Sequence, residues 1–502
     1  MALETLILTT KQRFLDHAVQ STLLSIAVAF VTYVLFNETV RSRARVPGLG
    51  GPKGWPLIGN LWDIRSNAAE KYEEWAKVYG DVYQVQMGNV PVVVVNSAAA
   101  TKTLWVSHSQ ALSSRPTTYT FHKIASSTAG LTIGTSPYDE SLKRRKKGAA
   151  VALNRPAIQS YVPYLDMESK TFIEDLFTYG KAGKIPIDPL PLVQRLSLSL
   201  AMTINWGVRV PSHEDKLFRE IVETSAKARE MRDRRDHYLR TLNNELAEKV
   251  VMGSNKPCIQ ANVIKFKEEK LSDVELISIS LSVLGGGFET VSNTVQFSMA
   301  FLAQHPDIQD KAYEAIREFQ GSEDPLCDAA DDQKCAYVNG LAKEALRYFT
   351  VIPLNLPRQS IRDIEYNGVL IPEGTTFYMN AMACNHDRNL WDDPEVFRPE
   401  RWIEKPDAPV FTFGLGYRMC AGHLLASREL YLVFMRLLSS FRLEIHGHVD
   451  TNPRTGMKNP RDLIMAPKKY EILCVPRNEN LLRQALAEHE VDEMCPAVNI
   501  TF

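Results

Sequence analysis

The sequence predicts a mainly α-helical globule with small β-sheets (α+β), preceded by one N-terminal membrane-spanning helix. Three observations support this prediction. Residues 18–37 carry no charge, apolar residues from about residue 101 onward mostly follow helical spacing, and two segments alternate like strands around Gly-Asn or Asn-Gly turns. The two strand-like segments are DVYQVQMGNVPVVVVNS (81–97) and IEYNGVLIPEGTTFYMN (364–380).

The composition is that of a globular protein. The chain has 502 residues and a formal charge of −1, from 58 Lys and Arg against 59 Asp and Glu. This length allows a large core or more than one domain, and the balanced charge gives no reason to expect a nucleic-acid partner. The seven cysteines are scattered and include no CxxC pair. They therefore indicate a reducing compartment rather than a disulfide framework or a zinc cluster.

The uncharged run 18–37 is about as long as a hydrocarbon core requires. Arg41, Arg43 and Arg45 follow it, and basic flanks predict that the rest of the chain faces the cytosol. The alternative is an amphipathic or core helix. We divide the chain into a membrane anchor with its basic flank (1–45), a Pro/Gly-rich hinge (46–62), one large domain (63–480) and a C-terminal tail (481–502).

The stretch FTFGLGYRMCAGHLL (411–425) crowds Cys420 with glycines just before a helical pattern. Glycines allow close backbone approach, and the N–H groups at a helix start favour a thiolate. Cys420 is therefore either a thiolate held against a flat partner or a buried structural cysteine, which is the commoner role of a single cysteine.

Three other motifs contain charged or hydroxyl side chains that are candidates for a functional or structural site. LSVLGGGFETVSNTVQ (281–296) interrupts an apolar helix with three glycines before Glu289 and Thr290, which indicates either a site or a close helix crossing. In LAKEALRYF, Glu344 and Arg347 share a helical face, as a surface ion pair would. In DDPEVFRPERW, Arg401 needs a carboxylate if it is buried, and Glu344 is a candidate.

Together these motifs resemble the cytochrome P-450 monooxygenases. Phe413-x-x-Gly416-x-Arg418-x-Cys420-x-Gly422 is similar to the family's haem-thiolate motif, and the other motifs follow the family's order. The resemblance extends from residue 18 to about residue 475 and implies the cytochrome P-450 fold. It implies haem b (iron protoporphyrin IX) as cofactor, with Cys420 as the axial ligand of the iron and Phe413 packed beside it.

The resemblance also implies roles for other residues. Arg418 and Arg358 would face the haem propionates. The family often has a Trp and an Arg in the helix over the other propionate, and here Tyr138 with Lys143 or Arg144 would replace them. Glu289 and Thr290 would relay protons to bound O2, with room left by Gly286. Glu344, Arg347 and Arg401 would form a structural lock.

The resemblance further implies electrons from NADPH through a membrane-bound NADPH-cytochrome P-450 reductase, docked on a basic face such as Lys143–Lys147. It places the protein in the endoplasmic reticulum membrane as a single-pass protein facing the cytosol. Alternatives are a haem-thiolate isomerase or dehydratase, which needs no external electrons, and a membrane-bound haem carrier.

Several phrases resemble the fungal phenylacetate-hydroxylase branch, including LRYFTVIPLNLPR and FTFGLGYRMCAG. They imply ring hydroxylation of phenylacetate or a hydroxyphenylacetate, with a tailoring oxidase of fungal secondary metabolism as the alternative. Phe288 would narrow the pocket over the haem. Arg115, His122 and Asn355 are candidate partners for a substrate carboxylate.

Residues 219–250 form one uninterrupted helical pattern of thirty-two residues without Gly or Pro. Globular helices are usually shorter, and here the apolar register stumbles at Thr224-Ser225. In the family this region roofs the substrate pocket. We therefore expect that a segment is missing between about 222 and 227, by deletion or by a wrongly predicted splice junction, and that the chain binds haem but hydroxylates poorly.

Overall fold

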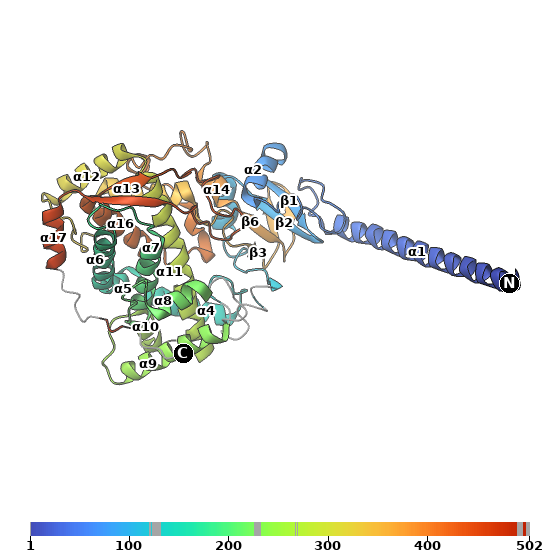
Figure 1. The fold of residues 1–502 in the computed structure, drawn as a ribbon, viewed down its shortest axis with the longest axis horizontal. Helices are drawn as coiled ribbons and strands as arrows, with labels where there is room; N and C mark the ends of the chain where they lie inside the picture. Colours follow the sequence, from blue (N-terminus) through green and yellow to red (C-terminus); the bar gives the residue numbers. More distant parts are fainter. Residues whose placement is uncertain are drawn as a thin grey trace.

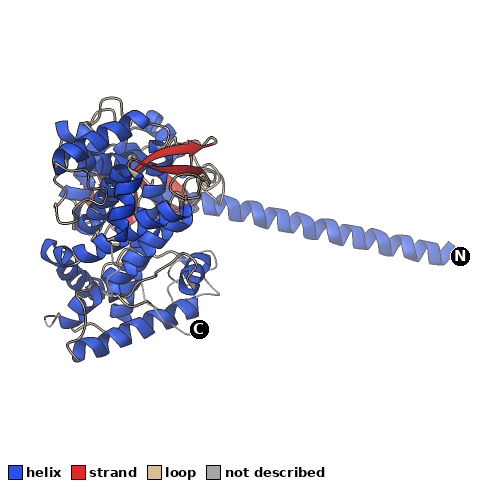
Figure 2. Cartoon of the chain, turned by 60° about the vertical axis from the view of Figure 1, so that its left-hand side comes forward, coloured by secondary structure: helices blue, strands red, loops and turns tan. Residues whose placement is uncertain are grey.

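The computed structural model describes residues 2–119, 122, 132–224, 232–266, 268, 270–488 and 495–497. A long helix, α1 (Ala2–Ala44), projects from a globule that consists mostly of helices (Figures 1 and 2). Its residues 17–44 are long and apolar enough to cross a membrane, and the fold buries none of their most apolar stretch. Leu24 and Phe36 are 66% and 67% exposed, which a hydrocarbon environment explains. As predicted, α1 is a candidate membrane span.

The central helix of the globule is α11 (Asp273–Leu302). A capping box fixes its start, where Ser272 and Glu275 each accept a backbone N–H of the other with their side chains. α11 also has the length and composition of a membrane span, but half of its most apolar stretch is buried in the fold. It packs along α7 (Leu190–Trp206), so it is the interior helix that the sequence predicts.

The helices around α11 form the largest apolar core, on the side of the globule away from α1 (Figure 1). Beside a smaller apolar cluster that contains α4 (Glu140–Ala152), α5 (Arg155–Ser160) and α10 (Ile259–Lys265), the helices of the largest core are α7, α6 (Val162–Tyr179), α12 (Pro306–Gln320), α13 (Ala336–Phe349), α16 (His423–Ser440) and α17 (Glu479–Ala487). α17 crosses the boundary expected at residue 480, and its Leu482 is fully buried in this core. The C-terminal tail therefore begins inside the globule.

The β-structure is small and lies partly beside the base of α1 (Figure 1). One sheet has the order β1-β2-β6-β3, made of β1 (Val82–Met87), β2 (Val90–Val95), β6 (Thr376–Met379) and β3 (Arg358–Gln359). Two antiparallel pairs complete it: β4 (Ile364–Tyr366) with β5 (Val369–Ile371), and β7 (Phe441–His446) with β8 (Glu471–Pro476). Asn367 and Gly368 turn between β4 and β5 with φ of +49° and +78°, so both predicted strand segments are confirmed.

Shorter elements connect these parts. They are α2 (Ala68–Tyr79), α3 (Ala98–Lys102), η1 (Thr103–Ser107), α14 (Ala381–Asn385), α15 (Arg401–Glu404), η3 (Phe411–Phe413) and η4 (Gly416–Arg418).

The segment 46–62, expected to be a hinge, is fastened to the globule. The side-chain amide of Gln84 accepts from Val46 N at 2.9 Å and donates to Val46 O at 2.8 Å. Arg41, near the end of α1, is 4% exposed and donates to Trp55 O at 2.5 Å. The Pro- and Gly-rich segment is therefore a connector that packs on the globule, and its contacts fix the end of α1 relative to the sheet.

The helical pattern expected over 219–250 is confirmed on both sides of residues 225–231, and its continuity across them stays a prediction. The structure has α8 (Lys216–Thr224) and α9 (Arg232–Val251), and residues 225–231 lie outside the described part of the chain.

Candidate active site

Cys420 lies in a glycine-rich loop between η4 and the start of α16. Its backbone N–H donates to Phe413 O at 2.9 Å, which closes the loop. Gly414 and Gly416 have φ of +67° and +64°, and a Cβ at Gly416 would lie 2.1 Å from the carbonyl oxygen of Trp105. Glycine is required at 416 both by its backbone conformation and by this contact.

Among the seven cysteines, all within the described residues, Cys420 alone is exposed. Cys384, by contrast, is buried against the Thr101 hydroxyl at 3.2 Å, and burial raises its pKa to about 12. Nearby protein atoms still raise the pKa of the Cys420 thiol by desolvation, and a backbone N–H at Gly422 lowers it only in part. The helix start alone thus does not favour the thiolate as expected. The thiol is accessible to solvent, and a metal ion bound to it would supply the positive charge that favours the thiolate.

Four cationic side chains converge beside this loop. They are Arg115, Arg358, Arg418 and Lys146, and the three arginines are at most 8% exposed. Burial, and then the charges of the three arginines, lower the pKa of Lys146 to about 8. Burial, and then Arg418, lower the pKa of Arg358 to about 9. We call these four residues the cation cluster.

The cation cluster is held by backbone carbonyls. Arg418 donates to Ser113 O at 3.0 Å and Ser136 O at 3.0 Å, and Arg115 donates to Pro357 O at 2.7 Å. In the described part of the chain, no ion pair joins any of the four to a carboxylate, and Arg358 Nη1 is buried without a partner. Buried positive charges without counter-charges are costly, so the cation cluster fits a ligand with two or more acidic groups.

The cation that α4 contributes beside the Cys420 loop is neither Lys143 nor Arg144, the two expected from the sequence. Lys143 pairs at the surface with Glu140 at 2.6 Å, and Arg144 pairs with Glu275 at 2.8 Å, so neither joins the cation cluster. Lys146, which sequence reasoning missed, donates to Tyr417 O and lies 3.5 Å from the centre of the Tyr417 ring. The sequence could have indicated Lys146, because it follows the buried Leu142 by four residues and residues four apart share a helix face.

Tyr138 remains near this loop without joining the cation cluster. Its ring meets the ring of Tyr417 edge-on at 5.9 Å, and Lys143 lies 5.1 Å from its centre. It therefore packs against the residue that Lys146 contacts.

The middle of α11 has one open face. A Cβ at Gly285 or at Gly286 would meet nothing within 4 Å, whereas one at Gly287 would contact Ala201 of α7 at 3.7 Å. The Thr290 hydroxyl donates to Gly286 O at 2.6 Å, one turn back. The glycines therefore leave space beside the hydroxyl-bearing turn, as the sequence predicts for Gly286.

Phe288 does not line this space. It is 5% exposed and packs in an apolar cluster with Ala201, Met202 and Tyr238, so the expectation that it narrows the pocket is wrong. It lies two residues from Gly286, and on a helix such a spacing directs the two positions to different faces. Glu289 is partly buried on the turn that carries Thr290.

The predicted lock among Glu344, Arg347 and Arg401 is present in the structure. Fully buried Glu344 accepts from Arg347 Nη2 at 2.8 Å and from Arg401 Nε at 3.0 Å. Two further donors were missed by sequence reasoning, Trp402 Nε1 at 2.9 Å and Arg398 N at 2.8 Å. The surface-pair alternative for Glu344 and Arg347 is thereby excluded.

The remaining candidates for a substrate carboxylate are engaged elsewhere. Asn355 donates to Phe411 O at 3.3 Å and so braces the loop that leads to Cys420. His122 Nε2 lies 3.2 Å from Thr135 O, and its Nδ1 lies 2.9 Å from Thr118 N. Arg115 belongs to the cation cluster. In this structure none of the three is arranged as a dedicated substrate anchor.

A glycine-bounded thiol beside a cation cluster, a central helix with an open glycine turn and a Glu-Arg-Arg lock define a haem-thiolate architecture. The family model for cytochrome P450 matches residues 49–239 and 222–474, and the chain belongs to this family. The two matched ranges share residues 222–239.

Among curated proteins, the chain is 55% identical to 3-hydroxyphenylacetate 6-hydroxylase of Emericella nidulans, over 97% of this chain and 100% of the relative. That alignment runs over 520 residues, more than the 502 of this chain, so the relative has residues without a counterpart here. The chain is 37% identical to phenylacetate 2-hydroxylase of the same fungus, over 93% and 97% of the two chains. It is 36% identical to a cytochrome P450 monooxygenase of Mycosarcoma maydis, over 91% and 92%.

Proposed function

We propose that this cytochrome P450 inserts one oxygen atom from O2 into the aromatic ring of phenylacetate or a hydroxyphenylacetate. The observation that carries the proposal is the cation cluster beside Cys420, within a chain similar along its length to a hydroxyphenylacetate hydroxylase. The electrons would come from NADPH through a membrane-bound reductase. The anchor would hold the protein in the endoplasmic reticulum membrane as a single-pass protein, with the globule in the cytosol.

The residues present fit a haem. Cys420 would bind the iron, Phe413 would pack beside the sulfur, and the cation cluster would neutralise the propionates with charge-assisted hydrogen bonds. When bound, the haem supplies the oxygen-activating chemistry, to which a thiolate ligand contributes electron density.

On the other side of the site, Thr290 and Glu289 would deliver protons. The Thr290 hydroxyl now donates to Gly286 O, so it must turn toward the open face before it can donate a proton there. Glu289 would then restore that proton from the solvent side.

Two substitutions test these roles. Cys420→Ala should abolish the thiolate-type spectrum of the reduced carbon monoxide complex. Thr290→Ala should keep that spectrum but release most of the consumed electrons as peroxide instead of hydroxylated product. Thr294→Ala is the matched control, because its hydroxyl donates to Thr290 O at 2.8 Å inside the helix. Tight coupling in Thr290→Ala would remove Thr290 from the mechanism.

A binding screen tests the substrate class. Phenylacetates that shift the Soret band support the proposal, and inertness toward all of them favours a tailoring oxidase of secondary metabolism. Product formation without added reductase or NADPH would instead identify an isomerase or dehydratase.

The basic run Lys143–Lys147 offers less free charge to a reductase than its sequence indicates. Lys143, Arg144 and Lys147 pair with Glu140, Glu275 and Glu268, and Lys146 belongs to the cation cluster. We therefore expect reductase docking to depend little on these side chains.

The expected missing segment near 222–227 remains a prediction. Two observations support it. The two family matches overlap at residues 222–239 instead of following one another, and the alignment with the 3-hydroxyphenylacetate 6-hydroxylase runs over more residues than this chain has. If the segment is absent from the transcript as well, water exclusion and substrate positioning over the haem should both be poor.

A further inference from the structure

Asn385, the last residue of the short helix α14, lies between the Glu-Arg-Arg lock and the glycine-rich loop that carries Cys420. Its side chain is fully buried. Its carbonyl oxygen accepts from Arg347 Nη1 at 3.0 Å, and the same guanidinium is held by the fully buried carboxylate of Glu344 at 2.8 Å. The backbone of Asn385 is therefore anchored to the lock.

The side-chain amide of Asn385 is bound to the start of the Cys420 loop. Its Oδ1 accepts the backbone N–H of Phe411 at 3.0 Å, and its Nδ2 donates to the Thr412 hydroxyl at 3.0 Å. Phe411 begins η3, and the last residue of η3, Phe413, accepts the backbone N–H of Cys420 at 2.9 Å. One amide thus fixes the turn to which the backbone of the cysteine is hydrogen-bonded.

The same amide also supports the end of α13. Its Nδ2 donates a second hydrogen bond, at 2.9 Å, to the hydroxyl of Thr350, which itself donates to Arg347 O at 2.6 Å. Thr350 has a φ of +43°, a conformation that β-branched residues rarely adopt and that surrounding contacts must maintain. The Asn385 side chain therefore joins the end of the lock helix and the Cys420 loop through three hydrogen bonds.

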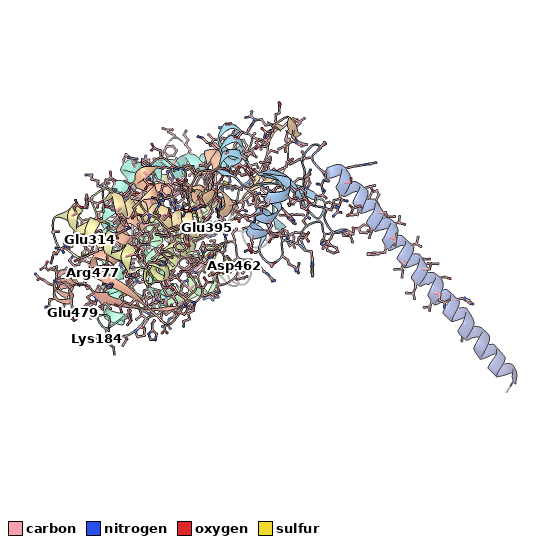
Figure 3. The ribbon with its side chains drawn as sticks, turned by 90° about the horizontal axis from the view of Figure 1, so that it is seen from above. Lys184, Glu314, Glu395, Asp462, Arg477 and Glu479 are labelled. Carbon is pink, nitrogen blue, oxygen red and sulfur yellow. The ribbon has the colours of Figure 1, made fainter. Side chains whose placement is uncertain are left out.

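A second arm of the lock leads to the surface instead. Arg347 also donates to Pro394 O at 2.8 Å. The next residue, Glu395, has a side chain that is 52% exposed (Figure 3). On that side the contacts of the lock end at solvent, whereas through Asn385 they continue to the Cys420 loop.

We propose that Asn385 is a positioning residue, which transmits the geometry of the lock to the Cys420 loop and so sets where the sulfur lies relative to the haem iron. The inference rests on the proposed role of Cys420 as iron ligand, and not on the substrate. Without the amide, the N–H of Phe411 and two hydroxyls lose their partner, so the loop can move and the iron–sulfur bond can break. The sulfur then keeps the electron pair of that bond and takes up a proton from water, because desolvation raises the pKa of the free thiol.

The test compares Asn385→Ala with Asn380→Ala in the full chain with haem. Asn380 is the matched control, because it caps the other end of α14, is equally buried, and donates to Ala69 O at 2.9 Å and to Asn96 Oδ1 at 3.0 Å. Both variants should lower the midpoint of urea unfolding to a similar extent. Only Asn385→Ala should raise the ratio of thiol-type to thiolate-type spectrum in the reduced carbon monoxide complex. We expect a rise of about fivefold for each hydrogen bond that the loop loses, and a further rise as the pH is lowered.

A second measurement needs no haem. Hydrogen exchange in the haem-free chain reports on the loop itself, and the backbone amides of residues 411–420 should exchange faster in Asn385→Ala but not in Asn380→Ala. Thr412→Val removes one hydroxyl that the amide binds and keeps the shape of the side chain. It should change the spectrum and the exchange in the same direction, and it decides the question if Asn385→Ala does not fold.

The two ways in which the inference can fail are distinguishable. If the variants at 385 and 412 match Asn380→Ala in both spectrum and exchange, Asn385 contributes to stability alone and the proposal is overturned. If the unchanged chain itself lacks the thiolate-type spectrum, the role of Cys420 as iron ligand fails, and this inference fails with it.

Discussion

Replacing Lys146 with methionine isolates one member of the cation cluster. Lys146→Met keeps most of the apolar stem and removes the charge that faces Arg115, Arg358 and Arg418. A hydrogen bond from a charged donor contributes about 1.5–3 kcal/mol. The variant should therefore bind haem about 10- to 150-fold more weakly than the unchanged chain.

The pH dependence gives a second signature of the same residue. Without a bound anion the pKa of Lys146 is about 8, and an anion beside it raises that pKa. The bound state then holds the proton more tightly, so haem affinity is complete below about pH 8 and falls as the pH rises above it. Arg358, with a pKa of about 9, adds a further fall at higher pH that the variant retains.

Haem loss to an excess of apomyoglobin, followed by absorbance from pH 6.5 to 9, measures both effects. Lys143→Met is the control, because Lys143 belongs to the same helix but pairs with Glu140 at the surface. The reasoning is refuted if the two variants lose haem equally fast, or if Lys146→Met keeps the fall in affinity that begins near pH 8.

Three further predictions concern stability and chain length. Glu344→Gln should lower the free energy of unfolding in urea by about 3–5 kcal/mol, because it leaves two buried arginines unpaired. Glu404→Gln removes a charge from an exposed ion pair and should lower it by less than about 1 kcal/mol. Equal losses of stability in the two variants would contradict the lock. Burial raises the pKa of Glu429 to about 8, so stability should fall between about pH 4.5 and pH 8, where the unfolded chain releases a proton that the folded chain retains. Glu429→Gln should flatten that fall, and an unchanged pH profile would remove Glu429 as its cause. Sequencing the transcript should show additional codons near 222–227, and a transcript without them together with efficient, tightly coupled hydroxylation would disprove the missing segment.

The sequence predicted those features that local chemistry specifies. The glycines around Cys420 are required by backbone contact, the Asn367-Gly368 turn requires positive φ, and Arg401 requires a carboxylate when buried. Each of these constraints involves few residues, and their types alone indicate the structure.

The errors arose where long-range packing decides. Lys143 and Lys146 are chemically alike, and only the orientation of α4 on α11 determines which of them faces the cation cluster. A phenylalanine such as Phe288 can line a pocket or pack in a core. Here α7 covers the face of α11 that carries Phe288, so the side chain packs in the core. The prolines of the connector 46–62 predict a stiff segment, and only the structure shows that the side chains of Gln84 and Arg41 fasten it to the globule.

The cation cluster has a consequence for how cells make this protein. Until haem arrives, the newly made chain carries four mutually repelling charges beside the Cys420 loop, and the unfolded chain is free of that repulsion. A ligand that binds the folded chain but not the unfolded chain stabilises the fold by mass action. Haem would therefore stabilise the folded protein in addition to serving as its cofactor. The amount of mature enzyme should then follow the haem supply of the cell, because chaperones and proteases would remove chains that remain without haem.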